Sequence, residues 1–179
     1  MHNRNVNASP VIHGVDVGQF KQAARRFASG VTVVTTRHGD VLHGGTVSAF
    51  FSLSLEPLQV LISLNTSGRL AELVRQSGCF AVNILRAEQE PVSRLFATAQ
   101  RATSTGVLPG VDTDQDATGA PIISDCLAYF DCEVATQFES GDHTLFIGLV
   151  RAVGVSDGEP LVYFDGAYRT TAAAPVDPV

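Results

Sequence analysis

The chain has 179 residues, of which 45% are hydrophobic and 17% are charged, an ordinary balance for a globular protein with one core. Its formal net charge is −6 and it has no Lys/Arg cluster, which makes nucleic acid a poor partner because the phosphate backbone would be repelled. No apolar run approaches the ~20 residues that cross a bilayer, and the first residues lack the apolar centre of a signal peptide. We therefore expect a cytoplasmic protein without membrane contact.

The first half of the chain alternates between short helices and β-rich segments. Residues 1–16 show no period and are expected to form a flexible N-terminal segment. Apolar residues at i, i+3, i+4 and i+7 from Phe20 then predict a helix that Ser29-Gly30 ends. The elements predicted next are a strand over VTVVTTR, a returning strand over VLHGGTVSAF, a strand over LQVLISL, a helix capped by Thr66 or Ser67 and ended by Gly78, a strand over CFAVNIL and a short helix with Pro91 in its first turn.

The second half begins with a long segment, residues 98–120, that shows neither a helical nor a strand period and is expected to be a loop. AYFDCEVATQFE then alternates cleanly, which predicts a strand with Asp131 on its polar face. A tight turn follows, then a long strand over HTLFIGLVRAVGV, and LVYFDGAYR closes the fold as a strand or hairpin. Residues 171–179 are expected to be a flexible tail.

Six or seven predicted strands are joined mostly by short turns, which indicates antiparallel pairing in a mainly β fold with peripheral helices. The chain lacks the regular βαβ alternation of a doubly wound sheet. A small closed or split barrel satisfies this pattern best, because closure removes exposed strand edges.

Motifs of the common enzyme classes are missing from the sequence. No dinucleotide-binding, phosphate-loop, zinc-protease or serine-hydrolase pattern occurs. Cys79, Cys126 and Cys132 show no CxxC spacing, and with five scattered histidines they form no metal signature. We interpret the three cysteines as small buried hydrophobic residues.

One candidate site lies in HGGTVSAFFSLSLEP, residues 43–57, which is unusually small and hydroxyl-bearing for a core strand. Its glycines permit close backbone approach, and Thr46 and Ser48 add donors and acceptors that suit a flat heteroaromatic ring. The alternative, which composition alone favours, is a tight barrel corner where small residues relieve crowding.

Two further stretches are candidates. In NTSGRLAELV, the start of a helix offers free N–H groups and Arg69 to a phosphate, the alternative being an ordinary surface helix. In SGDHTLFIG, His143 opens a strand at the rim of the sheet, the alternative being a half-exposed histidine without a role. Neighbours along a strand point to opposite faces, so no pairing of Asp142 with His143 is expected.

Taken in order, six stretches of the chain resemble the flavin reductase-like family, the small reductase components of two-component flavin monooxygenases. They are FASGVTVVTT, HGGTVSAFFSLSLEP, SGCFAVNIL, GAPII with AYFDCEV, GDHTLFIGLV and EPLVYFDGAYR. The resemblance covers one domain over about residues 17–170. It implies a split antiparallel β-barrel of the FMN-binding split-barrel type, which forms a homodimer with the flavin near the interface.

The resemblance also implies an activity: NAD(P)H-dependent reduction of free FMN or FAD, which supplies reduced flavin to a partner flavin-dependent monooxygenase. NADH is preferred over NADPH because no basic pair is placed for a 2′-phosphate. The residues that the resemblance assigns to cofactor binding are Gly45, Thr46, Val47, Ser48, Ala49, Ser63, Asn65, Ser67, Arg69, Phe80, Ala81 and Asn83, with His143 beside the nicotinamide.

Two positions depart from the family pattern. Gly68 and Leu70 stand where the family usually has hydroxyl residues at the flavin phosphate, and Pro57-Leu58 replaces a common Pro-Pro. Two alternative functions therefore stay open. One is a non-catalytic flavin-binding barrel, and the other is an oxidoreductase that keeps its flavin as a prosthetic group.

Overall fold

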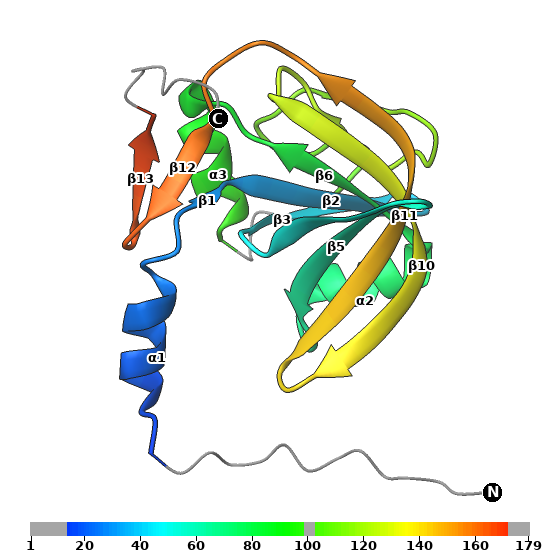
Figure 1. The fold of residues 1–179 in the computed structure, drawn as a ribbon. Helices are drawn as coiled ribbons and strands as arrows, with labels where there is room; N and C mark the ends of the chain where they lie inside the picture. Colours follow the sequence, from blue (N-terminus) through cyan, green and yellow to red (C-terminus); the bar gives the residue numbers. More distant parts are fainter. Residues whose placement is uncertain (1–13, 99–102, 172–179) are drawn as a thin grey trace, which may run out of the picture.

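Eight strands form one curved antiparallel sheet that dominates the computed structural model of the protein (Figure 1). The structure describes residues 14–98 and 103–171. Along the sheet the order is β4-β5-β11-β10-β6-β2-β3-β7. The bounds are β2 Thr32–His38, β3 Val41–Val47, β4 Phe50–Leu55, β5 Leu58–Asn65, β6 Cys79–Ile84, β7 Thr103–Thr105, β10 Ala128–Ser140 and β11 His143–Val155. The predicted mainly β, antiparallel fold is confirmed, although in the described residues the end strands β4 and β7 do not pair to close a barrel.

Two small sheets flank the large one. β1 (Ser29–Gly30), β12 (Leu161–Phe164) and β13 (Ala167–Thr170) form the first, with a tight turn of positive φ at Asp165-Gly166 between β12 and β13. β8 (Thr113–Asp114) and β9 (Ile122–Ile123) form the second. The closing hairpin is as predicted. The segment 98–120 is not wholly a loop, because β7 and β8 lie in it, and both are too short to show a period.

The helices are α1 (Val17–Ala24), α2 (Arg69–Ser77), the 3₁₀ turn η1 (Ala87–Gln89) and α3 (Glu90–Phe96). α2 ends at Gly78 in the left-handed conformation, as predicted. The predicted cap of α2 is wrong, because its N-cap is Gly68, with no side-chain hydrogen bond. Ser67 instead donates to the Asn65 side chain, and the Thr66 hydroxyl meets that of Thr144. None of the helices in residues 14–98 and 103–171 is long and apolar enough to cross a membrane.

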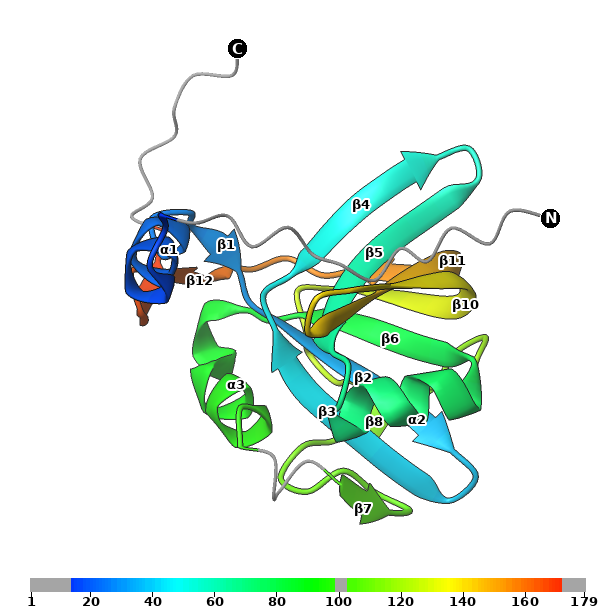
Figure 2. The ribbon, with the colours of Figure 1, turned by 90° about the horizontal axis from the view of Figure 1, so that it is seen from below.

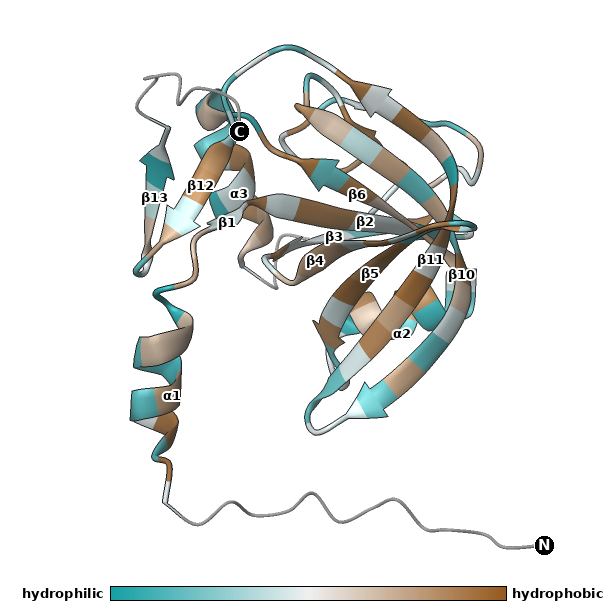
Figure 3. Ribbon diagram, in the orientation of Figure 1, coloured by the Kyte–Doolittle hydropathy of each residue, from teal (hydrophilic) through white to brown (hydrophobic). Residues whose placement is uncertain are grey.

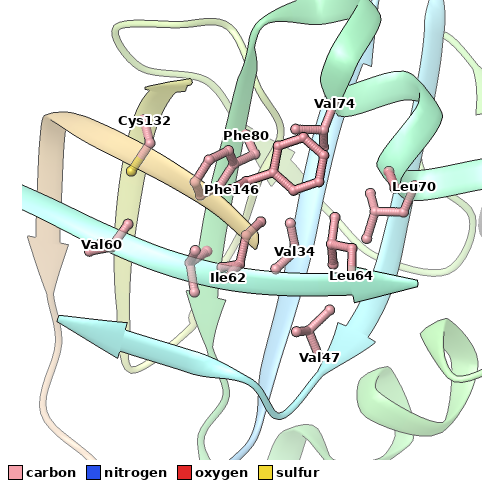
Figure 4. Close-up of a cluster of buried hydrophobic side chains, with 12 residues drawn as sticks. Val34, Val47, Val60, Ile62, Leu64, Leu70, Val74, Phe80, Cys132 and Phe146 are labelled. Carbon is pink, nitrogen blue, oxygen red and sulfur yellow. The ribbon is translucent and has the colours of Figure 1, made fainter. Parts of the chain in front are cut away.

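The main core lies between α2 and the inner face of the sheet (Figure 4). Phe80, Phe146 and Ile62 are fully buried there beside Val74 of α2. A second cluster under α3 contains Phe96 of that helix. All three cysteines are buried, as predicted. Loss of hydration raises the pKa of Cys126 to about 11 and that of Cys132 to about 12, which keeps both thiols protonated and unreactive.

The predicted strand VLHGGTVSAF is two strands. β3 ends at Val47 and pairs with β2 and β7, whereas β4 starts at Phe50 and pairs with β5 at the other end of the strand order. Ser48-Ala49 is therefore the corner where the chain crosses from one side of the sheet to the other (Figure 2). Periodicity runs through this corner, which is why the sequence alone does not mark it.

Asp131 lies on β10 but is fully buried, although its alternation predicts the polar face. Its carboxylate accepts hydrogen bonds from the backbone N–H (2.8 Å) and the hydroxyl of Thr118. The segment before β9 thus covers the face of β10 that carries Asp131. The alternation of residues within β10 cannot reveal a covering segment that lies elsewhere in the sequence.

Candidate functional site

A cleft of about 400 Å³ opens where β3 turns toward β4, beside the start of α2. Its volume lies within the ~300–1,000 Å³ typical of small-molecule sites. The backbone strip of residues 43–49 forms one wall, and the ends of β5 and α3 and the first turn of α2 form others. His143 completes the lining. The three candidate stretches, remote in sequence, thus meet in one cleft.

Nine of the predicted site residues line this cleft. They are Gly45, Thr46, Val47, Ser48, Ala49, Ser63, Asn65, Arg69 and His143. Ser67 does not line the cleft, whereas Asn65 does. The backbone N–H and the hydroxyl of Ser67 both donate to Oδ1 of Asn65. Ser67 therefore acts on the cleft through Asn65.

The remaining predicted site residues, Phe80, Ala81 and Asn83, do not line this cleft. All three are fully buried, Phe80 in the main core and Ala81 in a small third cluster. The Asn83 amide donates to the Val33 carbonyl and accepts from the Ile123 N–H. All three residues lie on β6, which is a central strand between β10 and β2, and their side chains are buried.

Thr46 and Ser48 do not lie on one face of a single strand, because β3 ends at Val47. The Thr46 hydroxyl donates to the Ser93 carbonyl of α3 at 2.7 Å. Ser48 is exposed, and within the described part of the chain its hydroxyl has no hydrogen-bond partner. Ser48 therefore supplies the available hydroxyl of the strip, and Thr46 fixes the strip to α3.

Crowding accounts for the two glycines of the strip. A Cβ atom on Gly44 would lie 2.8 Å from the Phe96 ring, and one on Gly45 would lie 3.1 Å from Leu70. Small residues thus relieve crowding here, as the alternative interpretation holds, although both glycines lie within β3 and not at a corner; both are part of the cleft wall. Phe96 and Leu70 also line the cleft. Sequence reasoning placed Leu70 at the phosphate site but missed Phe96, because Phe96 lies on an ordinary amphipathic helix.

Gly44→Ala should lower the free energy of unfolding by about 1–3 kcal/mol, the usual cost of overpacking a well-filled core. Gly30→Ala is the matched control, since a Cβ atom there meets nothing within 4 Å and Gly30 does not have a positive φ. Urea unfolding of the two variants measures the difference. Equal stability of the two variants would show that α3 and Phe96 shift to accommodate the new methyl group at little energetic cost.

The first turn of α2 faces the cleft through Arg69, Leu70 and Ala71. Because Gly68 provides no side-chain cap, the N–H groups of this turn keep their capacity to bind an anion. The Arg69 guanidinium donates to Glu72 at 2.8 Å and holds the pKa of that carboxyl below its usual value. Leu70 is buried in the main core, so its position supplies packing.

His143 lies directly across from Asn65 in the pairing of β11 with β5. Contrary to expectation, its Nδ1 is 2.7 Å from Oδ1 of Asp142, because Asp142 belongs to the turn and escapes strand alternation. This hydrogen bond holds the pKa of Asp142 below its usual value. With Nδ1–H donated to the carboxylate, Nε2 of the neutral ring remains as an acceptor for a ligand.

Arg75 of α2 joins the two loops at this end of the cleft. Its guanidinium donates to the Thr144 hydroxyl at 2.9 Å and, more weakly, to the Thr66 carbonyl at 3.4 Å. The backbone N–H of Thr66 donates to the Asp142 carbonyl at 2.9 Å. The loop before α2 and the turn that carries His143 are therefore fixed to each other.

Comparison with known proteins identifies the family. The model of the flavin reductase like domain matches residues 24–172. The chain is 37% identical over 154 residues to an NADH-dependent flavin reductase of Rhodococcus sp, covering 84% of each chain. It is 37% identical over 151 residues to the reductase component of 4-hydroxyphenylacetate 3-monooxygenase of Thermus thermophilus, covering 84% of this chain and 93% of that one. The solved structure of flavin reductase PheA2 superposes with a TM-score of 0.79 at 38% identity, over 89% of this chain and 100% of that chain. The protein therefore belongs to the flavin reductase-like family.

Proposed function

We propose that this protein uses NADH to reduce free flavin, FMN or FAD, and releases the reduced flavin to a partner flavin-dependent monooxygenase in the cytoplasm. The observation that carries the proposal is the single cleft that joins the 43–49 strip, the uncapped start of α2 and His143. The names of the Rhodococcus and Thermus relatives support the same activity and the same kind of partner.

In this proposal the flavin ring lies against residues 45–49, where the backbone and the Ser48 hydroxyl meet its polar edge. Donors at that edge stabilise the negative charge that develops as the flavin is reduced. The flavin phosphate lies at the first turn of α2, where the N–H groups and Arg69 are available. His143 borders the nicotinamide and accepts a hydrogen bond from its carboxamide through Nε2.

The two cofactors supply the chemistry, which is hydride transfer from the nicotinamide to the flavin. The protein has to hold the two rings about 3–3.5 Å apart and aligned. The side chains therefore bind and align the two rings. Hydride transfer between the rings requires neither a general base nor a nucleophile from the protein.

The absence of hydroxyl residues at Gly68 and Leu70 is consistent with a flavin that binds and dissociates during turnover. Without hydroxyl groups at these positions, the phosphate relies on backbone N–H groups and on Arg69, which is half exposed and already paired with Glu72. A charge pair exposed to water contributes little to binding. Weak retention of the phosphate favours flavin as a substrate over flavin as a prosthetic group.

Steady-state oxidation of NADH and NADPH, each with FMN and with FAD, tests the proposal. We expect turnover that saturates with added flavin and a higher kcat/KM for NADH than for NADPH. Flavin binding without any NADH oxidation would instead identify a non-catalytic flavin-binding barrel.

We further propose that the protein is a homodimer. Large apolar side chains are exposed on the β4–β5 hairpin, where Phe51 is 57% and Leu55 85% exposed, and on α1, where Phe20 is 66% exposed. The ribbon of α1 carries both hydrophobic and hydrophilic residues (Figure 3). No residue of α1 is buried. Apolar surfaces of this kind mark interfaces, and two-fold dimers are the commonest closed assembly.

Phe51→Lys should shift the protein from dimer to monomer, because it places a charge in the apolar surface of the hairpin. Val107→Lys is the control, since Val107 is 71% exposed but lies far along the chain from β4 and β5. Sedimentation velocity at micromolar concentration measures the assembly. A wild-type protein that is monomeric there and fully active would contradict the proposal.

A further inference from the structure

A second cleft, of about 240 Å³, lies beside the first. It is lined by Val31, Thr46, Val47, Ser48, Ala97, Tyr163 and Tyr168. Four of these residues, Thr46 to Ser48 and Ala97, also line the first cleft. The two clefts therefore adjoin along this strip, and a ligand long enough to pass the strip could occupy both.

Two tyrosines of the C-terminal hairpin form the wall of the second cleft. Tyr163 of β12 and Tyr168 of β13 are direct cross-strand partners, with ring centres 5.4 Å apart and planes at 66°. Tyr163 is 38% exposed, so its ring is accessible to a ligand. Val31 and Val47 add apolar surface. A slot with aromatic and aliphatic walls suits a flat ring system.

Tyr168 is held in place before any ligand arrives. Its hydroxyl is 2.8 Å from the hydroxyl of Ser93, which is fully buried, and the Arg94 guanidinium lies 4.9 Å from its ring centre. The Ser93 carbonyl accepts the hydrogen bond from Thr46. One chain of contacts therefore connects the strip of the first cleft to the tyrosine wall of the second, and a preorganised wall costs less to bind against.

The charge of the two clefts suits phosphate groups between two rings. No Asp or Glu is among the described residues that line either cleft, although the whole chain has a net charge of −6. Arg69 lines the first cleft. The second cleft is smaller than the ~300–1,000 Å³ of sites that hold a whole drug-sized ligand, so it fits one ring system of a longer molecule.

We propose that Tyr163 and Tyr168 form a subsite for the adenine ring of a dinucleotide whose reactive ring lies in the first cleft. The inference rests on the proposed function, because both FAD and NADH carry an adenosine diphosphate group. Adenine is the chemistry that they share, and the test distinguishes the two sources.

AMP binding to the purified protein, followed by ligand-observed NMR or calorimetry, tests the subsite without any turnover. Tyr163→Ala should weaken AMP binding by between about 5-fold and 160-fold, the range for one base stacked on one aromatic ring. Tyr163→Phe keeps the ring and should bind AMP like the wild type. Tyr163→Leu keeps apolar bulk without the ring and should behave like Tyr163→Ala, which separates stacking from a loss of packing.

Truncated ligands then identify the source of the adenine. If it belongs to FAD, Tyr163→Ala weakens FAD binding and leaves FMN binding unchanged. If it belongs to NADH, Tyr163→Ala raises the KM for NADH but not that for reduced nicotinamide mononucleotide. No AMP binding by the wild type, or equal losses for the full and the truncated ligands, overturns the subsite.

The two proposals fail separately. Flavin reduction by the wild type together with an unaffected Tyr163→Ala variant removes the subsite and leaves the reductase. AMP binding that depends on the Tyr163 ring, in a protein that oxidises no NADH, leaves the subsite and removes the reductase.

Discussion

His143→Ala should raise the KM for NADH by about 2- to 12-fold, the equivalent of one hydrogen bond worth 0.5–1.5 kcal/mol. The reason is that Nε2 is the ring nitrogen left for a ligand once Nδ1–H is donated to Asp142. The kcat falls as well if the nicotinamide is held less well aligned. Flavin affinity should stay unchanged, because the flavin lies against the strip.

The control for this variant is His38→Ala, which removes an exposed imidazole at the end of β2 that lines neither cleft. Steady-state kinetics at saturating flavin and a flavin titration monitored by fluorescence provide the two readouts. Weaker flavin binding with unaltered NADH kinetics would assign His143 to the other cofactor. No change in either would make it a rim histidine without a role.

Arg75→Met should lower the free energy of unfolding by about 1–3 kcal/mol and raise the KM for flavin and NADH together. The guanidinium is the donor that reaches both the buried Thr144 hydroxyl and the Thr66 carbonyl, and removing it leaves a buried hydroxyl with one partner fewer. Because Thr66 also bonds to Asp142, the loop before α2 and the turn that carries His143 lose their shared support.

Arg151→Met is the matched control for Arg75→Met, since Arg151 makes a solvent-exposed pair with Glu133 and should cost less than about 1 kcal/mol. Arg75→Lys keeps the charge but not the forked geometry, and should fall between wild type and Arg75→Met. Urea unfolding and steady-state kinetics measure these effects. A stability loss at Arg75 with both KM values unchanged would make it a purely structural residue.

The sequence predicts the elements of the fold well where the hydrophobic periodicity is strong or where a residue such as glycine ends a helix or strand. Gly78 ends α2 because only the left-handed conformation closes the helix there, and HTLFIGLVRAVGV is long enough to specify β11 unaided. The division of residues 41–55 into β3 and β4 was not predicted, because alternation continues through Ser48-Ala49. The burial of Asp131 was missed because its partner, Thr118, lies in a segment without a period.

The residues of the candidate site also differ in whether local sequence signals could predict them. Its backbone strip, the start of α2 and His143 could be found from small residues, a helix start and a turn, because these are local signals. Phe80, Ala81 and Asn83 are buried and do not line the cleft, because the burial of a central strand depends on elements remote in sequence. The Asp142–His143 hydrogen bond depends on the geometry of a turn, and the role of Arg75 depends on Thr144, which is remote in sequence.

The amount of flavin reduced per protein distinguishes a flavin that is released from one that is retained. It is measured by mixing the purified protein, NADH and an excess of free flavin without oxygen. If flavin is a substrate that is reduced and released, the absorbance of oxidised flavin disappears until NADH or flavin is exhausted, at many equivalents per protein. Reduction that stops at one equivalent per protein would contradict release and would indicate a retained flavin. Reduction that never begins would contradict the reductase activity and would indicate a protein that only binds flavin.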